Sequence, residues 1–273
     1  MTAPLTSVNL KEPKEIPLTL TGLGHTPVPA ILTNPPYPTK RAVILCHGFL
    51  SDKHSRTNRR LTELLIPEGI ATFQFDWYGM GDLREHFPHL TLHQCLDQLE
   101  AIMTYLSEQG FSSLGLVGSS FGGFLAILAA ARFPTLRAVG LKCPVVDFSE
   151  SLRLEFGEAG MTAWQQTNLI PNVLGGQELI PLHYAFFEEC LTYDGYDRAS
   201  RITMPTRVVH GGKDALIPYP QIVRLLNTLP GPKDLRLLPE ADHQFGRPED
   251  FRIMTTLLAQ WMIEHVTHSG EVS

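Results

Sequence analysis

Residues 114–132 read LGLVGSSFGGFLAILAAAR, and this stretch decides the fold. An apolar run at Leu114–Val117 is typical of a buried strand, and the alanine- and leucine-rich run at Phe121–Arg132 is typical of a buried helix. Between them, a G-x-S-x-G sequence over residues 118–122 predicts a sharp turn that lifts one hydroxyl above the sheet. Ser120 is the candidate nucleophile, and Ser119, one place early, is the inferior one. The alternative is a glycine-rich turn whose serine only caps the helix.

The same alternation of strand and helix continues on both sides of this stretch. Continuous apolar runs predict strands at Ala42–Cys46, Ile70–Asp76, Ala138–Cys143, Thr206–Val209 and Asp234–Leu238. Apolar residues at helical spacing predict helices at Leu92–Leu106, Ile222–Leu229 and Met254–Trp261. The runs Ile16–Leu20 and Pro27–Leu32 predict an edge hairpin. The sequence therefore predicts an α/β class with a mostly parallel sheet.

One segment, residues 147–200, lacks this alternation. It holds aromatic patches and a Gly175-Gly176 turn, and a connection of about fifty residues is longer than an ordinary loop. We interpret it as an inserted cap over the carboxyl edge of the sheet. Residues 1–146 and 201–273 would then form one core.

Composition and charge narrow the possible partners. Hydrophobic residues make up 43% of the 273 residues and charged residues 18%, which allows a sizeable core and an apolar pocket for a small molecule. Lys and Arg number 22 against 28 Asp and Glu, a net charge of −6 that argues against nucleic acid as a partner. The chain has no basic leader followed by an apolar stretch and no long apolar run, so we expect a soluble, cytoplasmic protein with no membrane span. A homodimer is left open.

The four cysteines lie far apart, at Cys46, Cys95, Cys143 and Cys190. No CxxC or Cys/His cluster accompanies them, so neither a zinc site nor a disulfide scaffold is expected. Cys46 and Cys143 lie in apolar runs, where a buried free thiol is the simplest interpretation. We expect no metal and no organic cofactor.

A nucleophilic serine needs a base and an acid that orients the base. His243 follows the last predicted strand, and Asp214 follows the strand at Thr206–Val209. The chain order Ser, Asp, His, each after a different strand, places all three at one sheet edge. Asp147, after the preceding strand, is the rival acid.

An oxyanion hole needs two backbone N–H groups aimed at one point. Phe121 directly follows the nucleophile and would supply one. Phe49, after His47-Gly48, would supply the other from the loop that follows the strand at Ala42–Cys46. We interpret His47 as a hydrogen-bonding residue that holds this loop, not as a second base.

Five motifs together resemble the α/β-hydrolase superfamily: Cys46-His-Gly-Phe49, Asp76-Trp-Tyr-Gly-Met-Gly-Asp82, Gly118-Ser-Ser-Phe-Gly-Gly123, His210-Gly-Gly-Lys-Asp214 and Asp242-His243. Their spacing is similar to the branch that contains carboxylesterases, feruloyl (cinnamoyl) esterases, monoacylglycerol lipases and serine aminopeptidases. The cap looks most like that of bacterial feruloyl esterases. Two features depart from that group: Ser119 stands where it usually has His, and residues 82–85 replace its usual Asp-Ser-x-Gly.

The resemblance implies an α/β-hydrolase fold with an inserted cap and acyl transfer from an ester to water through Ser120. Candidate residues for an apolar pocket under the cap are Trp77, Phe148, Trp164 and Phe187, for which ordinary packing is the competing interpretation. Alternatives on the same triad are an aminopeptidase or amidase and a monoacylglycerol lipase. A non-catalytic binding module is a further alternative. Dehalogenases and epoxide hydrolases carry Asp at the nucleophile position, which disfavours them.

Overall fold

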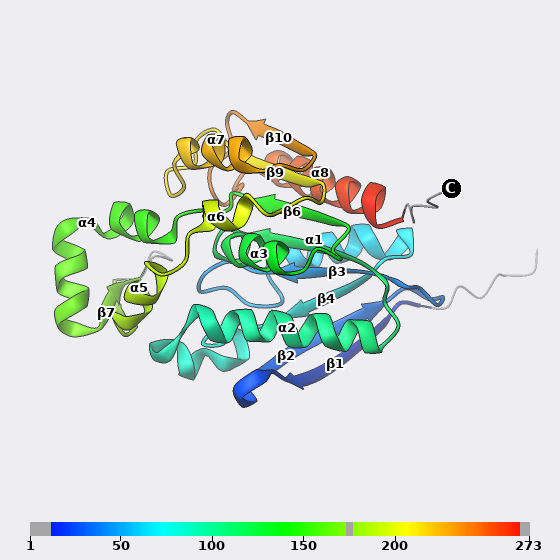
Figure 1. Cartoon of the computed structure of the whole chain (residues 1–273), viewed down its shortest axis with the longest axis horizontal. Coiled ribbons are helices and arrows are strands. Elements are labelled where there is room, and N and C mark those ends of the chain that lie inside the picture. The colour runs from blue at the N-terminus through cyan, green and yellow to red at the C-terminus, as the bar shows by residue number, and fades with distance from the viewer. Residues whose placement is uncertain (1–11, 173–176, 268–273) are drawn as a thin grey trace, which may run out of the picture.

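A mostly parallel central sheet organises the chain (Figure 1). The computed structural model describes residues 12–172 and 177–267. In the order β1-β2-β4-β3-β5-β6-β9-β10, the sheet contains β1 (Lys14–Thr21), β2 (Pro27–Asn34), β4 (Ala71–Phe75), β3 (Arg41–Cys46), β5 (Ser113–Ser119), β6 (Ala138–Lys142), β9 (Thr206–Gly211) and β10 (Lys233–Leu238). β2 runs antiparallel to β1 and to β4, and the remaining pairs are parallel. The carboxyl ends of the parallel strands therefore meet at one edge of the sheet.

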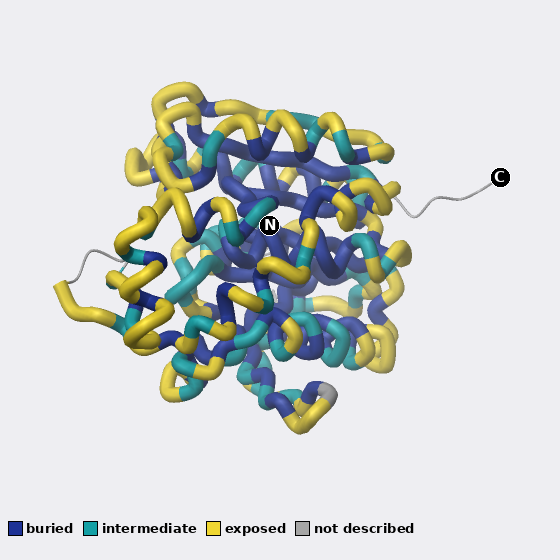
Figure 2. Tube along the Cα trace, turned by 60° about the vertical axis from the view of Figure 1, so that its left-hand side comes forward, coloured by how far each residue is buried: buried dark blue, intermediate teal, exposed yellow. Residues whose placement is uncertain are grey.

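Helices cover both faces of this sheet. They are α1 (Arg56–Leu65), α2 (Leu92–Glu108), α3 (Phe121–Arg132), α7 (Tyr219–Thr228) and α8 (Pro248–Thr267), with short 3₁₀ turns at Leu23–His25, Ile66–Glu68 and Gly81–His89. Ala42 and Ile44 of β3 pack into the core that includes α2 and α3, whereas Val43 and Leu45 pack into the core that includes α1 and α8. Successive strand residues point to opposite faces, so a strand covered on both sides needs an unbroken apolar sequence. Figure 2 shows the consequence, a buried interior under exposed outer surfaces.

Between β6 and β9 the chain leaves the sheet. It passes through α4 (Phe148–Thr167), β7 (Leu169–Pro171), β8 (Leu179–Pro181), α5 (Ala185–Cys190) and α6 (Gly195–Ala199). β7 and β8 pair with each other, and α4, α5 and β7 lie together at the left end of the molecule in Figure 1. Gly157 has φ of +62° and breaks α4 into two pieces, because this backbone region suits glycine and bends the helix.

The sequence predicted most of this architecture. The class and the mostly parallel sheet are confirmed, and so are the predicted strands and the hairpin of β1 and β2. α1 was not predicted, because Asn58 occupies one of its three buried positions beside Leu61 and Leu65. α4 to α6 were also not resolved as separate elements. The predicted Gly175-Gly176 turn lies outside the described residues.

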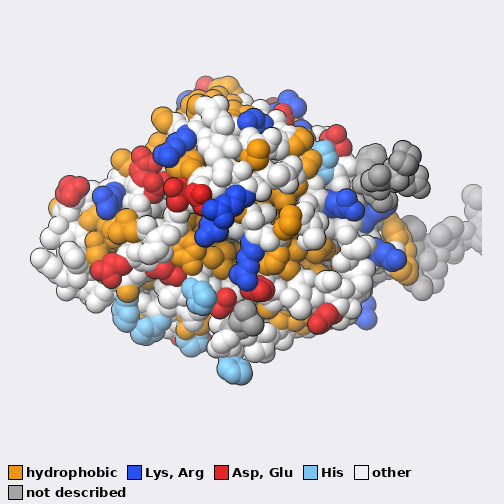
Figure 3. Space-filling model, viewed as in Figure 1, with side chains coloured by type: hydrophobic (Ala, Val, Ile, Leu, Met, Phe, Trp, Pro, Cys, Tyr) orange, Lys and Arg blue, Asp and Glu red, His pale blue; other side chains and the backbone are white. Residues whose placement is uncertain are grey.

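The surface carries mixed charge. On the face in Figure 3, Lys and Arg side chains lie beside Asp and Glu side chains, with hydrophobic side chains between them. Neither sign of charge dominates that face. None of the helices in the described part of the chain combines the length and the apolar content that a bilayer crossing requires.

Candidate active site

Ser120 lies on a strained turn between β5 and α3. Its φ is 52° and its ψ is −113°, a conformation that is unusual for a residue with a side chain. The flanking glycines make this turn possible. A Cβ on Gly118 would collide with the backbone of Gly122, and a Cβ on Gly122 would collide with the carbonyl groups of Cys46 and His47. The G-x-S-x-G spacing is therefore a packing requirement of this turn.

The structure brings Ser120, His243 and Asp214 together from three separate loops. His243 Nδ1 lies 2.8 Å from Asp214 Oδ2, and its Nε2 lies 3.0 Å from Ser120 Oγ. An ionised carboxylate only accepts hydrogen bonds, so Nδ1–H donates to Asp214. Nε2 of the neutral ring then accepts from the Ser120 hydroxyl, which is the orientation that a general base needs.

The Asp214 carboxylate is held from two sides. Its Oδ1 accepts from the backbone N–H groups of Leu216 and Ile217, each at 2.9 Å. Burial alone would raise the pKa of Asp214, but the His243 ring and the Ile217 N–H outweigh burial and lower it to about 2. The rival acid, Asp147, instead accepts at the start of α4 from Ser149 and from the N–H of Glu150. It has no described bond to His243.

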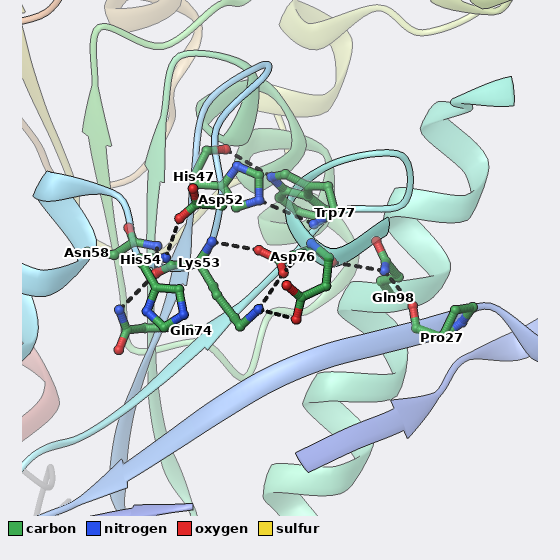
Figure 4. A network of polar contacts seen from close by, with 11 residues as sticks. Pro27, His47, Asp52, Lys53, His54, Asn58, Gln74, Asp76, Trp77 and Gln98 are labelled. Carbon is green, nitrogen blue, oxygen red and sulfur yellow. Dashed lines mark hydrogen bonds and ion pairs between the residues drawn. The ribbon is translucent and has the colours of Figure 1, made fainter. Parts of the chain in front are cut away.

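The loop after β3 is held by His47. Its Nδ1–H donates to the Gly48 carbonyl at 2.8 Å, and Trp77 donates both its backbone N–H to Nε2 (3.2 Å) and its indole N–H to the His47 carbonyl (2.9 Å) (Figure 4). Burial lowers the pKa of His47 to about 4, so the ring stays neutral and keeps one donor and one acceptor. These contacts agree with the structural role that the sequence analysis assigned to His47.

A buried ion pair fixes the next part of the same loop. Lys53 Nζ lies 2.6 Å from Asp76 Oδ2 and 2.6 Å from Asp82 Oδ2, and Asp76 Oδ1 accepts from the backbone N–H of Lys53 at 2.7 Å (Figure 4). Gln98 donates to the Asp76 carbonyl at 3.1 Å. This network was not predicted, although a charged residue at the end of the buried strand β4 was a visible signal.

Two backbone N–H groups remain available beside Ser120. Within the described chain, neither Phe49 N–H nor Phe121 N–H donates a hydrogen bond. The two phenyl rings pack edge to face with centroids 5.6 Å apart, and an added Cβ on Gly48 would lie 3.7 Å from Ser120 Cβ. The residues named for the oxyanion hole therefore lie next to the candidate nucleophile.

Ser120 and His243 open into a cavity of about 420 Å³. Of the four aromatic residues predicted to line a pocket, only Phe148 does so among the described cavity residues. The other three do not line this cavity in the described structure, because their side chains are used for packing. Trp77 lies beneath the loop of His47, and Trp164 and Phe187 pack against each other with Trp164 Nε1–H donating to the Leu182 carbonyl at 2.7 Å.

The cavity is also less apolar than predicted. Lys142 at the end of β6 and Arg56 at the start of α1 both line it, as does Glu155 of α4. Sequence analysis missed Lys142 because it ends an otherwise apolar strand. A lysine at the carboxyl end of a buried strand, beside the strand of the nucleophile, was the signal that could have found it.

In the described part of the chain, one buried group of side chains has donor atoms close enough for a metal. Cys143, His210 and Asp214 offer ligand atoms within 4.8 Å of one another. A metal would need the Cys143 thiolate, and burial raises the pKa of this thiol. It would also compete with His243 for Asp214. We therefore interpret the group as the buried surroundings of Asp214, in which His210 Nδ1 lies 3.9 Å from its carboxylate.

Comparisons with known proteins bear on the family and the fold. Residues 37–180, a little over half of the chain, match the family model described as serine aminopeptidase, S33. The structure of Est1E from Butyrivibrio proteoclasticus with ferulic acid bound is similar, with a TM-score of 0.78 and 21% identity over 92% of this chain and 100% of that one. At this identity the likeness shows the fold.

Two curated relatives are named for activities that differ from each other. A Mycobacterium tuberculosis protein named as a phosphoribosyl transferase is 24% identical over 255 residues, 90% of this chain and 46% of that protein. This chain thus spans about half the length of that relative. A rat protein named palmitoyl-protein thioesterase ABHD10, mitochondrial, is 22% identical over 218 residues, 78% of this chain and 72% of that protein.

Proposed function

Because the chain belongs to the serine aminopeptidase S33 family of α/β-hydrolases, we propose that it is a serine hydrolase that cleaves small carboxylic esters through an acyl-enzyme. The observation that carries this proposal is the hydrogen-bonded series from Ser120 to His243 to Asp214. Ser120 is the nucleophile, His243 the general base and then the general acid, and Asp214 the group that orients His243.

The reaction proceeds in two steps. The Ser120 oxygen attacks the ester carbonyl while its proton passes to His243 Nε2, and the alcohol leaves with that proton. Water then attacks the acyl-enzyme, gives a proton to His243 and releases the acid. The N–H groups of Phe49 and Phe121 stabilise the negative oxygen of both tetrahedral intermediates, a contribution worth about 3 kcal/mol for each donor.

We also propose that residues 147–200 act as the cap of this site. The support is that the first piece of α4 provides Phe148 and Leu152 to the cavity beside Ser120. Gly157 ends this piece of α4. The acyl or alcohol part of the substrate would lie between this piece and the carboxyl ends of β5 and β6.

A fluorophosphonate probe and an ester panel test the proposal. We expect the probe to label the wild type and not Ser120→Ala, and Ser120→Ala to lose at least about 10³-fold in kcat for 4-nitrophenyl acetate. His243→Ala should fall to a similar level. Labelling that persists in Ser120→Ala, or no turnover of 4-nitrophenyl esters, methyl ferulate and a monoacylglycerol, would contradict it.

An aminopeptidase is the second candidate, because the matched family model carries that description. Both reactions use the same three side chains, and only the leaving group differs. Turnover of an aminoacyl 4-nitroanilide faster than of the matched aminoacyl ester would favour the peptidase. We expect the ester to be faster.

A further inference from the structure

Lys142 lies directly beside the nucleophile. It is the last residue of β6, it pairs in register with Ser119 of β5, and its carbonyl accepts from the Ser120 N–H at 2.9 Å. Only 5% of the residue is exposed, and it lines the same cavity as Ser120 and His243. Lys142 therefore lines the space that a substrate would enter.

The Lys142 ammonium group has no hydrogen-bond or ion-pair partner among the residues that the structure describes. Among the described residues, Nζ makes no hydrogen bond and no ion pair, and it lies 5.5 Å from the ring centroid of Phe245. The carboxylates of Asp214 and Asp242 attract its charge, but they accept from His243 and from the Gly246 N–H instead. Burial lowers the pKa of Lys142, which reflects this lack of compensation. A buried cation without a partner is costly, so its presence in a cavity calls for an anion from outside.

A second cation lines the same cavity. Arg56 Nη2 donates to the carbonyl groups of Phe245 (2.8 Å) and Gln244 (3.3 Å), and its guanidinium lies 3.9 Å from the centroid of Phe251. These contacts fix its orientation without neutralising it, since no described carboxylate forms an ion pair with it. The charges of Arg56 and Lys142 repel each other, and a shared anion would remove this repulsion.

We propose that Lys142, with the charge of Arg56 behind it, forms an anion-binding subsite for a carboxylate carried by the ester substrate. The inference rests on the proposed ester hydrolysis at Ser120 and narrows its substrates to carboxylate-bearing esters. The carboxylate can belong to the acyl part, as in a half-ester of a dicarboxylic acid, or to the alcohol part. Charge-assisted hydrogen bonds to an ammonium are among the stronger polar contacts, so the subsite would control substrate choice.

Glu155 is the competing internal partner, because it lines the same cavity from α4. It forms no ion pair with Lys142 or Arg56 in the described structure, and it is an exposed residue. If the subsite serves a substrate anion, Glu155→Gln should increase the preference for anionic esters, because one repelling charge is removed. Loss of the preference in this variant would overturn the proposal.

Matched substrates test the subsite and locate the carboxylate. The acyl arm compares 4-nitrophenyl hydrogen adipate with 4-nitrophenyl hexanoate, and the alcohol arm compares the acetate esters of 4-hydroxybenzoate and 4-methylphenol. In each pair a carboxylate replaces a methyl group. We expect kcat/KM to favour the anionic ester at least tenfold in one arm, and this ratio to fall tenfold to a hundredfold in Lys142→Met.

Two further variants serve as controls. Lys142→Arg should keep most of the preference, because the positive charge remains. Lys233→Met removes an exposed lysine at the start of β10 and should leave the ratio within twofold of the wild type. A ratio near one in both arms, or an equal ratio in wild type and Lys142→Met, overturns the subsite.

A binding measurement separates this proposal from the hydrolysis itself. Monomethyl adipate and methyl hexanoate are titrated calorimetrically into Ser120→Ala, which cannot turn them over. We expect at least tenfold tighter binding of monomethyl adipate, and loss of that difference in Ser120→Ala/Lys142→Met. Hydrolysis of neutral esters without this difference refutes the subsite alone, whereas the difference without any hydrolysis refutes the function of Ser120 alone.

Discussion

Two lysines of the described structure are buried, and their surroundings are opposite. Lys53, 7% exposed, contacts the carboxylates of Asp76 and Asp82, each at 2.6 Å. Lys142, 5% exposed, has no described hydrogen-bond or ion-pair partner and lines the cavity. The pKa values move in opposite directions: burial lowers both, but the two carboxylates outweigh burial at Lys53 and raise its pKa.

This difference distinguishes Lys53, whose charge is used inside the protein, from Lys142, whose ammonium group is available to bind an anion. The Lys53 ammonium uses its hydrogen bonds inside the protein and fixes the loop that leads from β3 to α1. The Lys142 ammonium keeps its donors, and the protein tolerates the desolvation cost. If this distinction is correct, disturbing Lys53 should affect stability, whereas disturbing Lys142 should affect substrate choice more than stability.

The largest effect is expected for Asp76→Asn. The change leaves Lys53 buried with one exposed carboxylate, and removing one partner of a buried pair costs about 3–5 kcal/mol of unfolding free energy. Asp82→Asn is the matched control, because the Asp82 side chain is 66% exposed. It should cost about 0.5 kcal/mol. Urea denaturation measures both, and equal losses would show that burial does not govern this pair.

A smaller loss is expected for Gly81→Ala. Gly81 has φ of +56°, and an added Cβ would overlap the Asp76 carboxylate. We expect a loss of about 2–3 kcal/mol, from backbone strain plus displacement of the ion pair. Gly110→Ala isolates the strain, because Gly110 has φ of +85° and nothing within 4 Å of an added Cβ. If Gly81→Ala loses no more unfolding free energy than Gly110→Ala, the Asp76 carboxylate moves aside without cost.

The fold was largely readable from the sequence because its strands are buried on both faces. An unbroken apolar run such as Val43–Leu45 predicts a strand that is covered on both faces and is compatible with few other structures. α1 was missed for the converse reason, since its buried side includes Asn58, which donates to the carbonyl groups of Leu45 and Lys53. A polar residue that satisfies internal backbone groups does not show in a hydrophobic pattern.

The candidate catalytic residues could be predicted from the sequence because chain order constrains where they lie. The residues that line the pocket could not, because their positions depend on packing. Ser120, Asp214 and His243 each follow a strand, so parallel topology brings them to one edge. No such rule separates a pocket aromatic from a core aromatic, and Trp164 belongs to the core. Whether a buried lysine has a partner depends on residues distant in sequence, as Lys53 and Asp76 illustrate.

Lys142→Met should stabilise the protein slightly. Methionine has a similar shape without the charge, so removing an unpaired buried ammonium should increase the unfolding free energy by about 1 kcal/mol at pH 7. Lys233→Met, on the exposed surface, should stay within about 0.5 kcal/mol of the wild type. A loss of more than 1 kcal/mol in Lys142→Met would mean that Lys142 has a structural partner like that of Lys53.

The smallest expected effect is the pH dependence of the unfolding free energy that Lys142→Met gains over the wild type. The folded pKa of Lys142 is lowered from 10.5, so between the two pKa values the unfolded chain binds the extra proton and wild-type stability rises with pH. The gain from Lys142→Met is therefore full below the lowered pKa and disappears as pH approaches 10.5. Cys143, Asp214, Arg56 and Asp242, the neighbours that act on Lys142, are present in both proteins, so the difference between the two proteins reports Lys142. Urea denaturation of both proteins from pH 7 to 10 measures it. A gain that grows with pH would mean that the folded protein stabilises the ammonium, and Lys142 would then resemble Lys53.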